Sequence, residues 1–487
     1  MVQSKTIPAN LMKSHRILFW YRKDLRVHDN KTLMKALSIS RGITSIYIFD
    51  KNYPLDFNAQ SRAWFLGESL KELSQTWKEF GSRLIIEKGD PITIIPKIAK
   101  VINAKFVAWN KGIEPYEINK DLEIKSSLNK INIEVINSLD NLLISPNSIS
   151  TRNGKPYTVY GAFYKNVKSK LSNFNLQEEF MAKLELLDLE TELLDNPIIN
   201  LSAKKLENFI EKNNFPGYKI CPCKPGEKGA NYLLDNFLTS NKINNYDKSR
   251  DFPAENGTSY LSASLRFGTI SIRKLWNSSI NSTNQNKANY LSIEIWQKEL
   301  LWREFYQHCL FHFPELAEGP YRHKWRDFPW QNKQEWFDRW SNGETGIPII
   351  DAAMRQLNQS GWMHNRCRMI VASFLVKDLI CNWQMGEKKF LETLVDGDLA
   401  ANNGGWQWSS SSGMDPKPLR IFNPYTQTKK FDPLCKYIRF WVPELSRIPN
   451  SEIINGEISE IATLAYPKPL ISHNNQQRLF KSLYSEI

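Results

Sequence analysis

The chain has 487 residues, more than the roughly 250 to 300 that one hydrophobic core accommodates, so we expect at least two domains. Its residues are 41% hydrophobic and 24% charged, and no stretch approaches the ~20 apolar residues of a membrane span, which excludes an integral membrane protein. The net charge of +13 favours a polyanionic partner without proving one.

The N-terminal segment lacks an apolar core followed by a cleavage site, so we expect an intracellular, cytoplasmic protein. The six cysteines are too scattered for a disulfide framework. Histidines at zinc-binding spacing do not accompany them, so we expect no metal site. We interpret Cys221 and Cys223 as two surface thiols.

In residues 15–145, short β-branched runs alternate with helical patterns. The alternation predicts an α/β domain with a five-stranded, doubly wound parallel sheet. The expected strands are residues 17–21, 45–49, 83–87, 105–109 and 133–136. The expected helices are residues 31–39, 59–80, 92–102 and 117–129.

Polar side chains follow two of these strands. They are Arg22, Asp24, Arg26 and Asp29 after the first strand and Asn110 after the fourth. Ligands of such sheets bind outside the carboxyl ends of the strands, so a binding site and a solvated charged rim are both open interpretations. No glycine-rich phosphate loop follows a strand, so there is no fingerprint for dinucleotides or nucleoside triphosphates.

Prolines and polar runs mark residues 146–226 as an interdomain connection with short helices. Residues 227–487 have helical apolar spacing without alternating strands, which predicts a larger all-α domain. Its expected helices include residues 230–237, 272–276, 293–310, 336–340, 349–357, 366–380 and 388–394. Of the 16 tryptophans, 12 lie between residues 276 and 441, so this region has an unusual core or an unusual task.

On the helix expected over 293–310, Glu299, Trp302 and Arg303 share one face because they are spaced i, i+3 and i+4. Such a Glu–Arg pair is commonly a solvated surface pair of small energy. If the face lines a cavity, Glu299 can bond a base edge while Trp302 offers a stacking plane, as where single nucleotides are bound.

Arg366 and Arg368 stand at the start of the helix expected over 366–380, where cations oppose the helix dipole. We expect Asp396 or Asp398 to pair with Arg368, and a phosphate to pair with Arg366. We interpret His364, just before them, as a hydrogen-bonded structural histidine.

Two further segments stand out. Residues 258–262 (TSYLS) offer hydroxyls and backbone amides that suit a phosphate or a plain helix N-cap. Residues 396–408 (DGDLAANNGGWQW) combine acids, carboxamides, a glycine pair and tryptophans. That mixture predicts that something polar and aromatic is held there.

Five segments resemble the photolyase/cryptochrome family of flavoproteins: residues 19–26 (FWYRKDLR), 302–306 (WREFY), 361–369 (GWMHNRCRM), 396–408 and 420–424 (RIFNP). The likeness runs in order along the chain and is closest to bacterial class I cyclobutane pyrimidine dimer photolyases. It implies an α/β domain for a light-harvesting chromophore and a helical domain that binds FAD, with damaged bases flipped into a cavity above the flavin.

The resemblance implies four sets of site residues. FAD contacts are expected from Tyr246, Thr258, Ser259, Tyr260, Leu261, Ser262, Trp296, Arg303, Asn365, Arg368, Asp396, Gly397, Asp398 and Asn402. Catalytic contacts to the lesion are expected from Glu299, Trp302, Asn365, Met369 and Trp408. DNA contacts are expected from Arg250, Glu299, Trp302, Arg303, Tyr306, Asn365, Arg366, Arg368 and Gln427. Electron transfer to oxidised flavin is expected through Trp330, Trp383 and Trp406.

Several of these assignments also fit physically. Asp396 can neutralise the buried charge of Arg368. The neutral carboxamide of Asn402 can adapt to the protonation state of flavin N5. Glu299, if protonated, can stabilise charge that develops on the pyrimidine carbonyls. Tyr260 stands where some family members have arginine, which puts one phosphate contact in question.

The implied function is light-driven repair of cyclobutane pyrimidine dimers, in which excited FADH⁻ donates an electron to the dimer, the ring opens and the electron returns. Met369 replaces the histidine of the branch that repairs 6-4 photoproducts. The alternative is a cryptochrome-type blue-light photoreceptor, which usually adds a C-terminal tail, whereas this chain ends shortly after Pro469. A third hypothesis is a nucleic-acid-binding flavoprotein without repair activity.

The expected partner is UV-damaged DNA with a flipped-out dimer, bound by a monomer without an obligate protein partner. Trp109, Asn110 and residues 114–117 (EPYE) resemble the branch whose antenna is 8-hydroxydeazaflavin, which makes that chromophore the expected second cofactor.

Overall fold

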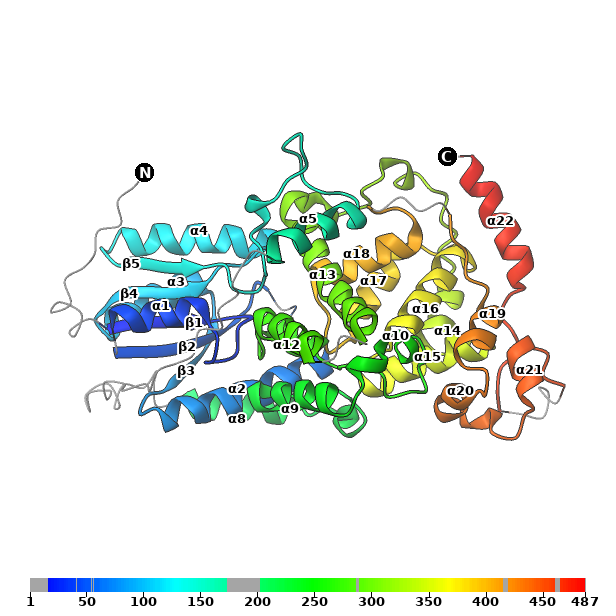
Figure 1. Cartoon of the computed structure of the whole chain (residues 1–487), viewed down its shortest axis with the longest axis horizontal. Coiled ribbons are helices and arrows are strands. Elements are labelled where there is room, and N and C mark those ends of the chain that lie inside the picture. Colours follow the sequence, from blue (N-terminus) through cyan, green and yellow to red (C-terminus); the bar gives the residue numbers. More distant parts are fainter. Residues whose placement is uncertain are drawn as a thin grey trace.

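The structure is a computed structural model that describes residues 16–40, 42–53, 55, 57–172, 202–285, 289–414, 419–459 and 465–486. An α/β domain and a helical domain lie side by side (Figure 1). None of the helices in the described part of the chain is long and apolar enough to cross a membrane.

The N-terminal sheet has five strands that pair in parallel in the order β3-β2-β1-β4-β5. They are β1 (Arg16–Tyr21), β2 (Gly42–Asp50), β3 (Leu84–Gly89), β4 (Ala104–Asn110) and β5 (Glu134–Ser138). The predicted doubly wound sheet is confirmed.

Helices cover both faces of the sheet, as Figure 1 shows. They are α1 (Lys31–Ile39), α2 (Gln60–Glu79), α3 (Pro91–Val101) and α4 (Pro115–Asn129). In β1, Ile17, Phe19 and Tyr21 pack with α1 and α2, whereas Leu18 and Trp20 pack with α3 and α4. Side chains alternate along a strand, so each face of the sheet supplies its own core.

Helices make up the rest of the described chain. In the sequence, α5 (Tyr160–Ser172) and α8 (Ser202–Lys212) fall in the connection between the two domains. The later helices are α9 (Gly226–Thr239), α10 (Tyr246–Ser249), α11 (Ser262–Phe267), α12 (Ile272–Gln285), α13 (Tyr290–His312), α14 (Gln334–Asn342), α15 (Pro348–Ser360), α16 (Asn365–Lys377), α17 (Trp383–Leu391), α18 (Leu399–Ser410), α19 (Pro424–Phe431), α20 (Lys436–Trp441), α21 (Asn450–Asn455) and α22 (His473–Ser485).

The helical region has two hydrophobic cores. One gathers residues of α5, α9, α12 and α13, and the other gathers residues of α14 to α17, α20 and α22 together with Trp406 of α18. Helix α5 packs on α13, whereas α8 packs on β3 and α2. Part of the predicted connection, residues 173–201, lies outside the described residues, and the predicted domain bounds stay predictions.

Two sequence-based interpretations are wrong. Cys221 and Cys223 are buried against the α/β core rather than exposed. The polar side chains after β1 do not form a solvated rim, because they are largely buried. Arg26, for example, is buried and donates to the buried Asp140 at 2.5 Å. Arg273 of α12 donates to the same carboxylate at 2.8 Å. Buried charges persist only when paired, so this cluster joins the two domains.

Candidate functional site

A cavity of about 470 Å³ opens between the two helical cores. One wall is α13, which contributes Glu299, Trp302, Arg303 and Tyr306. The opposite walls are α16, α18 and the turn between α17 and α18. This volume is typical of a site that encloses a small organic ligand.

Helix α18 forms the longest wall of the cavity. Asp398 caps its N-terminus by accepting from the amide of Ala401 at 2.9 Å. A Cβ on Gly404 would overlap the ring of Tyr306, whereas a Cβ on Gly405 would meet open space. The first glycine therefore lets α18 approach α13, and the second leaves the cavity open.

Arg368 and Asp396 form a two-bond ion pair at one end of the cavity. The Nη2 atom of Arg368 donates to both carboxylate oxygens of Asp396, at 3.0 and 2.8 Å. The guanidinium also donates through Nε to the carbonyl of Met363 at 2.9 Å. Of the two acids expected for Arg368, the structure selects Asp396, while Asp398 serves as a helix cap and accepts from Gln307 at 2.9 Å.

Asn402 lies on the cavity wall and is bonded to the main chain of Glu387. Its Nδ2 donates to the carbonyl of Glu387 at 3.0 Å, and Nδ2 of Asn403 donates to the Glu387 carboxyl at 2.9 Å. Burial raises the pKa of Glu387 to about 7, despite the hydrogen bond from Asn403. The neighbour of Asn402, Asn403, is therefore bonded to a carboxyl whose pKa lies near neutral pH.

Trp302 is held from behind by a second ring. Tyr160 of α5 stacks on it with ring centroids 3.6 Å apart and an interplanar angle of 9°. The Tyr160 hydroxyl donates to the carbonyl of Lys298 at 2.7 Å, which fixes the ring on α13. Sequence reasoning missed Tyr160, because no periodic pattern links it to Trp302.

Charged side chains form a chain along the rim. Arg250 donates to Glu299 at 2.7 Å and lies 3.8 Å from Asp251. Arg366 donates to Asp251 at 2.7 Å and lies over the ring of Phe431 at 4.3 Å. The anionic partner predicted for Arg366 is thus a protein carboxylate in this structure.

The cavity gathers all five predicted catalytic residues: Glu299, Trp302, Asn365, Met369 and Trp408. It also gathers the predicted flavin residues Ser262, Arg303, Arg368, Asp396, Gly397, Asp398 and Asn402, and the predicted DNA residues Arg250 and Tyr306. Its described lining does not include the predicted residues Tyr246, Thr258, Ser259, Tyr260, Leu261, Trp296, Arg366 and Gln427.

Three of the residues outside that lining have contacts that place them. The ring of Tyr246 lies under Arg250, 5.3 Å from its guanidinium. Trp296 of α13 packs on Phe237 of α9. Tyr260 packs on Trp362 at 5.2 Å and has a φ of 56°. A left-handed backbone is rare for a bulky residue, so the loop over 258–262 is held in a strained shape.

His364 has the structural role that its position predicts. Its side chain caps α16 by accepting from the amide of Arg366 at 3.1 Å. Burial lowers its pKa to about 4, so the ring stays neutral near pH 7 and can accept this hydrogen bond.

The three predicted electron-transfer tryptophans belong to one core region. Trp406 lines the cavity, Trp383 begins α17, and Trp330 packs at the edge of the same core. Among the described residues, no aromatic contact joins Trp406 directly to Trp383 or Trp330. Trp406 instead contacts Trp340, which sequence reasoning missed, with centroids 6.2 Å apart.

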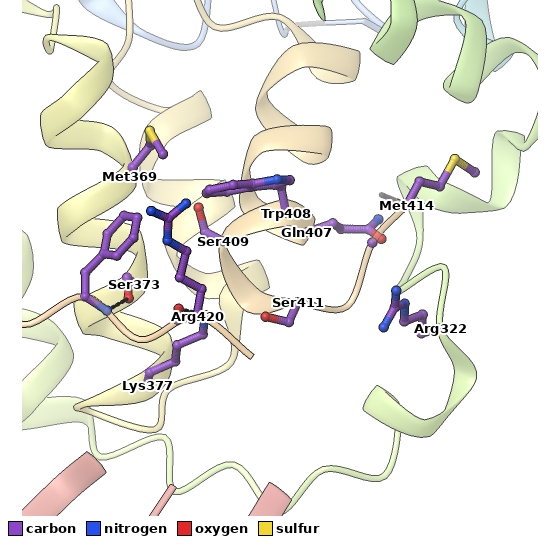
Figure 2. Close-up of a pocket in the computed structure, with 12 residues that line it drawn as sticks. Arg322, Met369, Ser373, Lys377, Gln407, Trp408, Ser409, Ser411, Met414 and Arg420 are labelled. Atoms are coloured by element: carbon purple, nitrogen blue, oxygen red, sulfur yellow. Dashed lines mark hydrogen bonds between the residues drawn. The ribbon is translucent and has the colours of Figure 1, made fainter. Parts of the chain in front are cut away.

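A second, small cavity adjoins the first and shares Met369, Trp408 and Ser409 with it. Figure 2 shows Arg420 reaching towards Met369 and Trp408, while Arg322 approaches from the opposite side. Lys377 lies below and donates to the carbonyl of Arg420 at 2.5 Å. Sequence reasoning assigned no role to these three side chains. The two arginines give the small cavity a positive lining, whereas burial lowers the pKa of Lys377 to about 7.

Residues 17–183 match the family described as DNA photolyase, and residues 296–486 match the family described as FAD binding domain of DNA photolyase. A deoxyribodipyrimidine photo-lyase of Synechococcus sp. is 45% identical over 474 residues, which span 97% of this chain and 96% of that protein.

Three solved structures are similar over almost the whole chain. A bacterial class III photolyase from Agrobacterium tumefaciens has a TM-score of 0.85 at 33% identity, covering 98% of each chain. An archaeal photolyase from Sulfolobus tokodaii with two FAD molecules has a TM-score of 0.79 at 29% identity, covering 97% of this chain and 100% of that one. A cryptochrome from Synechocystis sp. has a TM-score of 0.84 at 26% identity, covering 99% of this chain and 100% of that one.

The cavity suits the FAD that this domain binds. Three arginines, three acids and two carboxamides line it, and the rest of its lining is small, aliphatic or aromatic. A flat ring system with polar edges fits a space whose walls combine apolar surface with polar groups. With two family domains matched and a relative 45% identical along the chain, the protein belongs to the photolyase/cryptochrome family.

Proposed function

We propose that this protein uses light to repair cyclobutane pyrimidine dimers in DNA, and that it takes the flipped-out dimer into the cavity between α13, α16 and α18. The observation that carries the proposal is convergence: the residues expected for the flavin and those expected for the lesion line one cavity. Deoxyribodipyrimidine photo-lyase is also the name of the relative that is 45% identical.

In this proposal, Arg368, Asp396 and Asn402 would hold the ring system of FAD, and Ser262 with the loop before it would contact its phosphates. When bound and reduced, FAD supplies the light-excited electron that opens the cyclobutane ring. Asn402 suits flavin N5 because a carboxamide can either donate or accept a hydrogen bond.

The dimer enters above the flavin, between Trp302 and Trp408. Tyr160 fixes the plane of Trp302, so this indole is ordered before the lesion arrives. An ordered stacking plane strengthens binding, because less side-chain freedom is lost when the base stacks. Met369 lines the cavity, and its thioether has no proton to donate. This supports cyclobutane dimers as the substrate.

The rim cations contact the DNA backbone in this proposal. Arg250 and Arg366 are paired with Glu299 and Asp251 in the protein alone. A phosphate competes with these carboxylates for the guanidinium groups, so DNA binding frees Glu299 to meet the pyrimidine. Phosphate contacts of this kind position the strand without reading its sequence.

The antenna is proposed to lie at the carboxyl ends of β1 and β2. A small cavity there is lined by Trp20, Tyr47, Tyr53, Tyr116 and Lys120, among others. The rings of Tyr53 and Tyr116 stack with centroids 4.9 Å apart. Aromatic walls suit a planar chromophore, for which we keep 8-hydroxydeazaflavin as the proposal. When the protein is reconstituted with 8-hydroxydeazaflavin, light absorbed by that compound should excite the FAD of the helical domain. If only a second FAD added as antenna gave this energy transfer, the site would be assigned to FAD instead.

We further propose that the protein acts as a cytoplasmic monomer without an obligate protein partner. Sedimentation of the protein with dimer-containing DNA should give a single protein chain per lesion.

The repair reaction tests the proposal directly. The protein is photoreduced, mixed with dimer-containing single- or double-stranded DNA, and pyrimidine recovery is compared between light and darkness. Recovery only in light supports the proposal. Absence of recovery in light would remove the repair function, and equal recovery in darkness would remove the photochemical mechanism.

A cryptochrome-type photoreceptor is the second candidate, because the Synechocystis cryptochrome has a TM-score of 0.84 with this chain. The same assay separates the two candidates. A photoreceptor should show light-dependent flavin reduction without recovery of pyrimidines from either form of DNA.

A further inference from the structure

The turn between α17 and α18 is the part of the cavity wall with the least secondary structure. We take it as residues 391–398, and it contains Asp396 and Asp398. At its start, amides of residues 392–394 satisfy the carbonyls of Lys388 and Phe390, whereas the carbonyl of Leu391, the last residue of α17, accepts from a side chain outside the helix. What holds this turn therefore decides where its two carboxylates point.

Arg62 reaches this turn from the other domain. It lies in the first turn of α2 and is fully buried. Its Nη1 donates to the carbonyl of Leu394 at 2.5 Å, and its Nη2 donates to the carbonyl of Leu391. A positive charge at the C-terminal end of α17 is also favourable for the helix dipole.

The surroundings fix the guanidinium in place. Its Nε donates to the carbonyl of Leu55 at 2.9 Å, and Nη2 also donates to the side chain of Asn58. The neighbouring Ser61 donates to the carbonyl of Thr393 at 2.6 Å. Two consecutive residues of α2 thus bind three carbonyls of the same turn.

Gly397 gives independent support for this contact. A Cβ at this position would collide with Nη1 of Arg62, so the turn passes the guanidinium at a distance that only glycine allows. The carbonyl of Gly397 accepts from Nε of the buried Arg266 at 2.9 Å. The segment that joins Asp396 to Asp398 therefore lies between two buried arginines.

We propose that Arg62 is a positioning residue for the flavin: from the α/β domain, it holds the turn that aims Asp396 and Asp398 into the cavity. This inference rests on the proposed assignment of those two acids to FAD. The α/β domain then has a second role besides antenna binding, because one of its side chains fixes the geometry of the flavin site in the other domain.

Replacing Arg62 with Lys tests the role. Lysine keeps the charge, but its single ammonium cannot match the planar set of donors that reaches Leu55, Asn58, Leu391 and Leu394 together. We expect FAD to bind the variant roughly tenfold more weakly, as for the loss of a charge-assisted hydrogen bond. Hydrogen exchange at residues 391–398 of the FAD-free protein should become faster.

Two controls separate positioning from general damage. Arg273→Lys alters another buried arginine between the domains, whose partners Asp29 and Asp140 lie outside the flavin cavity. It should leave FAD affinity within about twofold of the unmodified protein. In an Asp396→Asn background, Arg62→Lys should have a smaller effect, because Asp396 is one of the two carboxylates through which Arg62 acts.

Three outcomes would overturn the inference: unchanged FAD affinity in a folded Arg62→Lys protein, an equal loss in Arg273→Lys, or a full effect in the Asp396→Asn background. If Arg62→Lys does not fold, Ser61→Ala removes one hydrogen bond to the same turn. It should weaken FAD binding by a few-fold, and unchanged affinity there also contradicts the inference. Failure of the unmodified protein to bind FAD would instead contradict the proposed function.

Discussion

Glu387 should make the stability of the FAD-free protein depend on pH. The residue is 8% exposed, and burial raises the pKa of its carboxyl from 4.5 to about 7. Because the folded chain holds this proton more tightly than the unfolded chain, the carboxyl contributes stability below pH ~4.5 that is lost as the pH rises through ~7. The full shift corresponds to about 3 kcal/mol of unfolding free energy.

Between about pH 5.5 and about pH 8.5, the part lost is about 2 kcal/mol. Glu387→Gln removes the titration but keeps an oxygen that can accept from Asn403. The unfolding free energy of both proteins is measured in urea at the two pH values. The two proteins share every other titrating group, so the difference between their pH dependences isolates Glu387. An equal loss in both proteins would refute the reasoning.

Three further changes test the site and its packing. Trp330→Phe should block photoreduction of oxidised FAD, followed by absorbance, while pre-reduced protein still repairs dimers; loss of both would contradict a role in electron transfer alone. Glu299→Ala should lower the quantum yield of repair about tenfold but change dimer affinity less, and an affinity loss alone would count against charge stabilisation. Gly404→Ala should lower the free energy of unfolding by about 1–3 kcal/mol, because the added methyl overlaps Tyr306. Gly405→Ala should raise it by about 0.5–1 kcal/mol, because its methyl meets open space. Equal shifts of the two variants in thermal unfolding would contradict this packing.

The sheet could be predicted because its signal is local. The run from Ile17 to Tyr21 is buried on both faces, which gives the continuous apolar stretch of a central parallel strand. Helix α17 was placed less well: the expected segment 388–394 catches only its second half. The missed signal was Asn382, whose side chain caps the helix by accepting from Gln384 at 3.0 Å.

The site was predictable only in part, because its contacts join residues that are distant in sequence. Spacing showed that Glu299 and Trp302 share a face, but not that Tyr160 stacks behind that indole. The contact of Arg62 with Leu394 spans 332 residues and ends on a backbone carbonyl, for which no sequence pattern exists. The buried state of Cys223 depends in the same way on tertiary packing, since a cysteine suits either environment.

The wall formed by α18 shows why segment 396–408 looked unusual. The cavity touches Asp398, Ala401, Asn402, Gly405 and Ser409 along this helix. Their spacing is that of an amphipathic stripe, which in an ordinary helix is filled by large apolar side chains that close the gap to the neighbouring helix. Here small and polar residues occupy the stripe, so the gap stays open as a site. The bulky tryptophans at 406 and 408 also line the cavity, where they supply the aromatic part of its wall. An apparent defect of core packing is therefore the feature that makes room for cofactor and substrate.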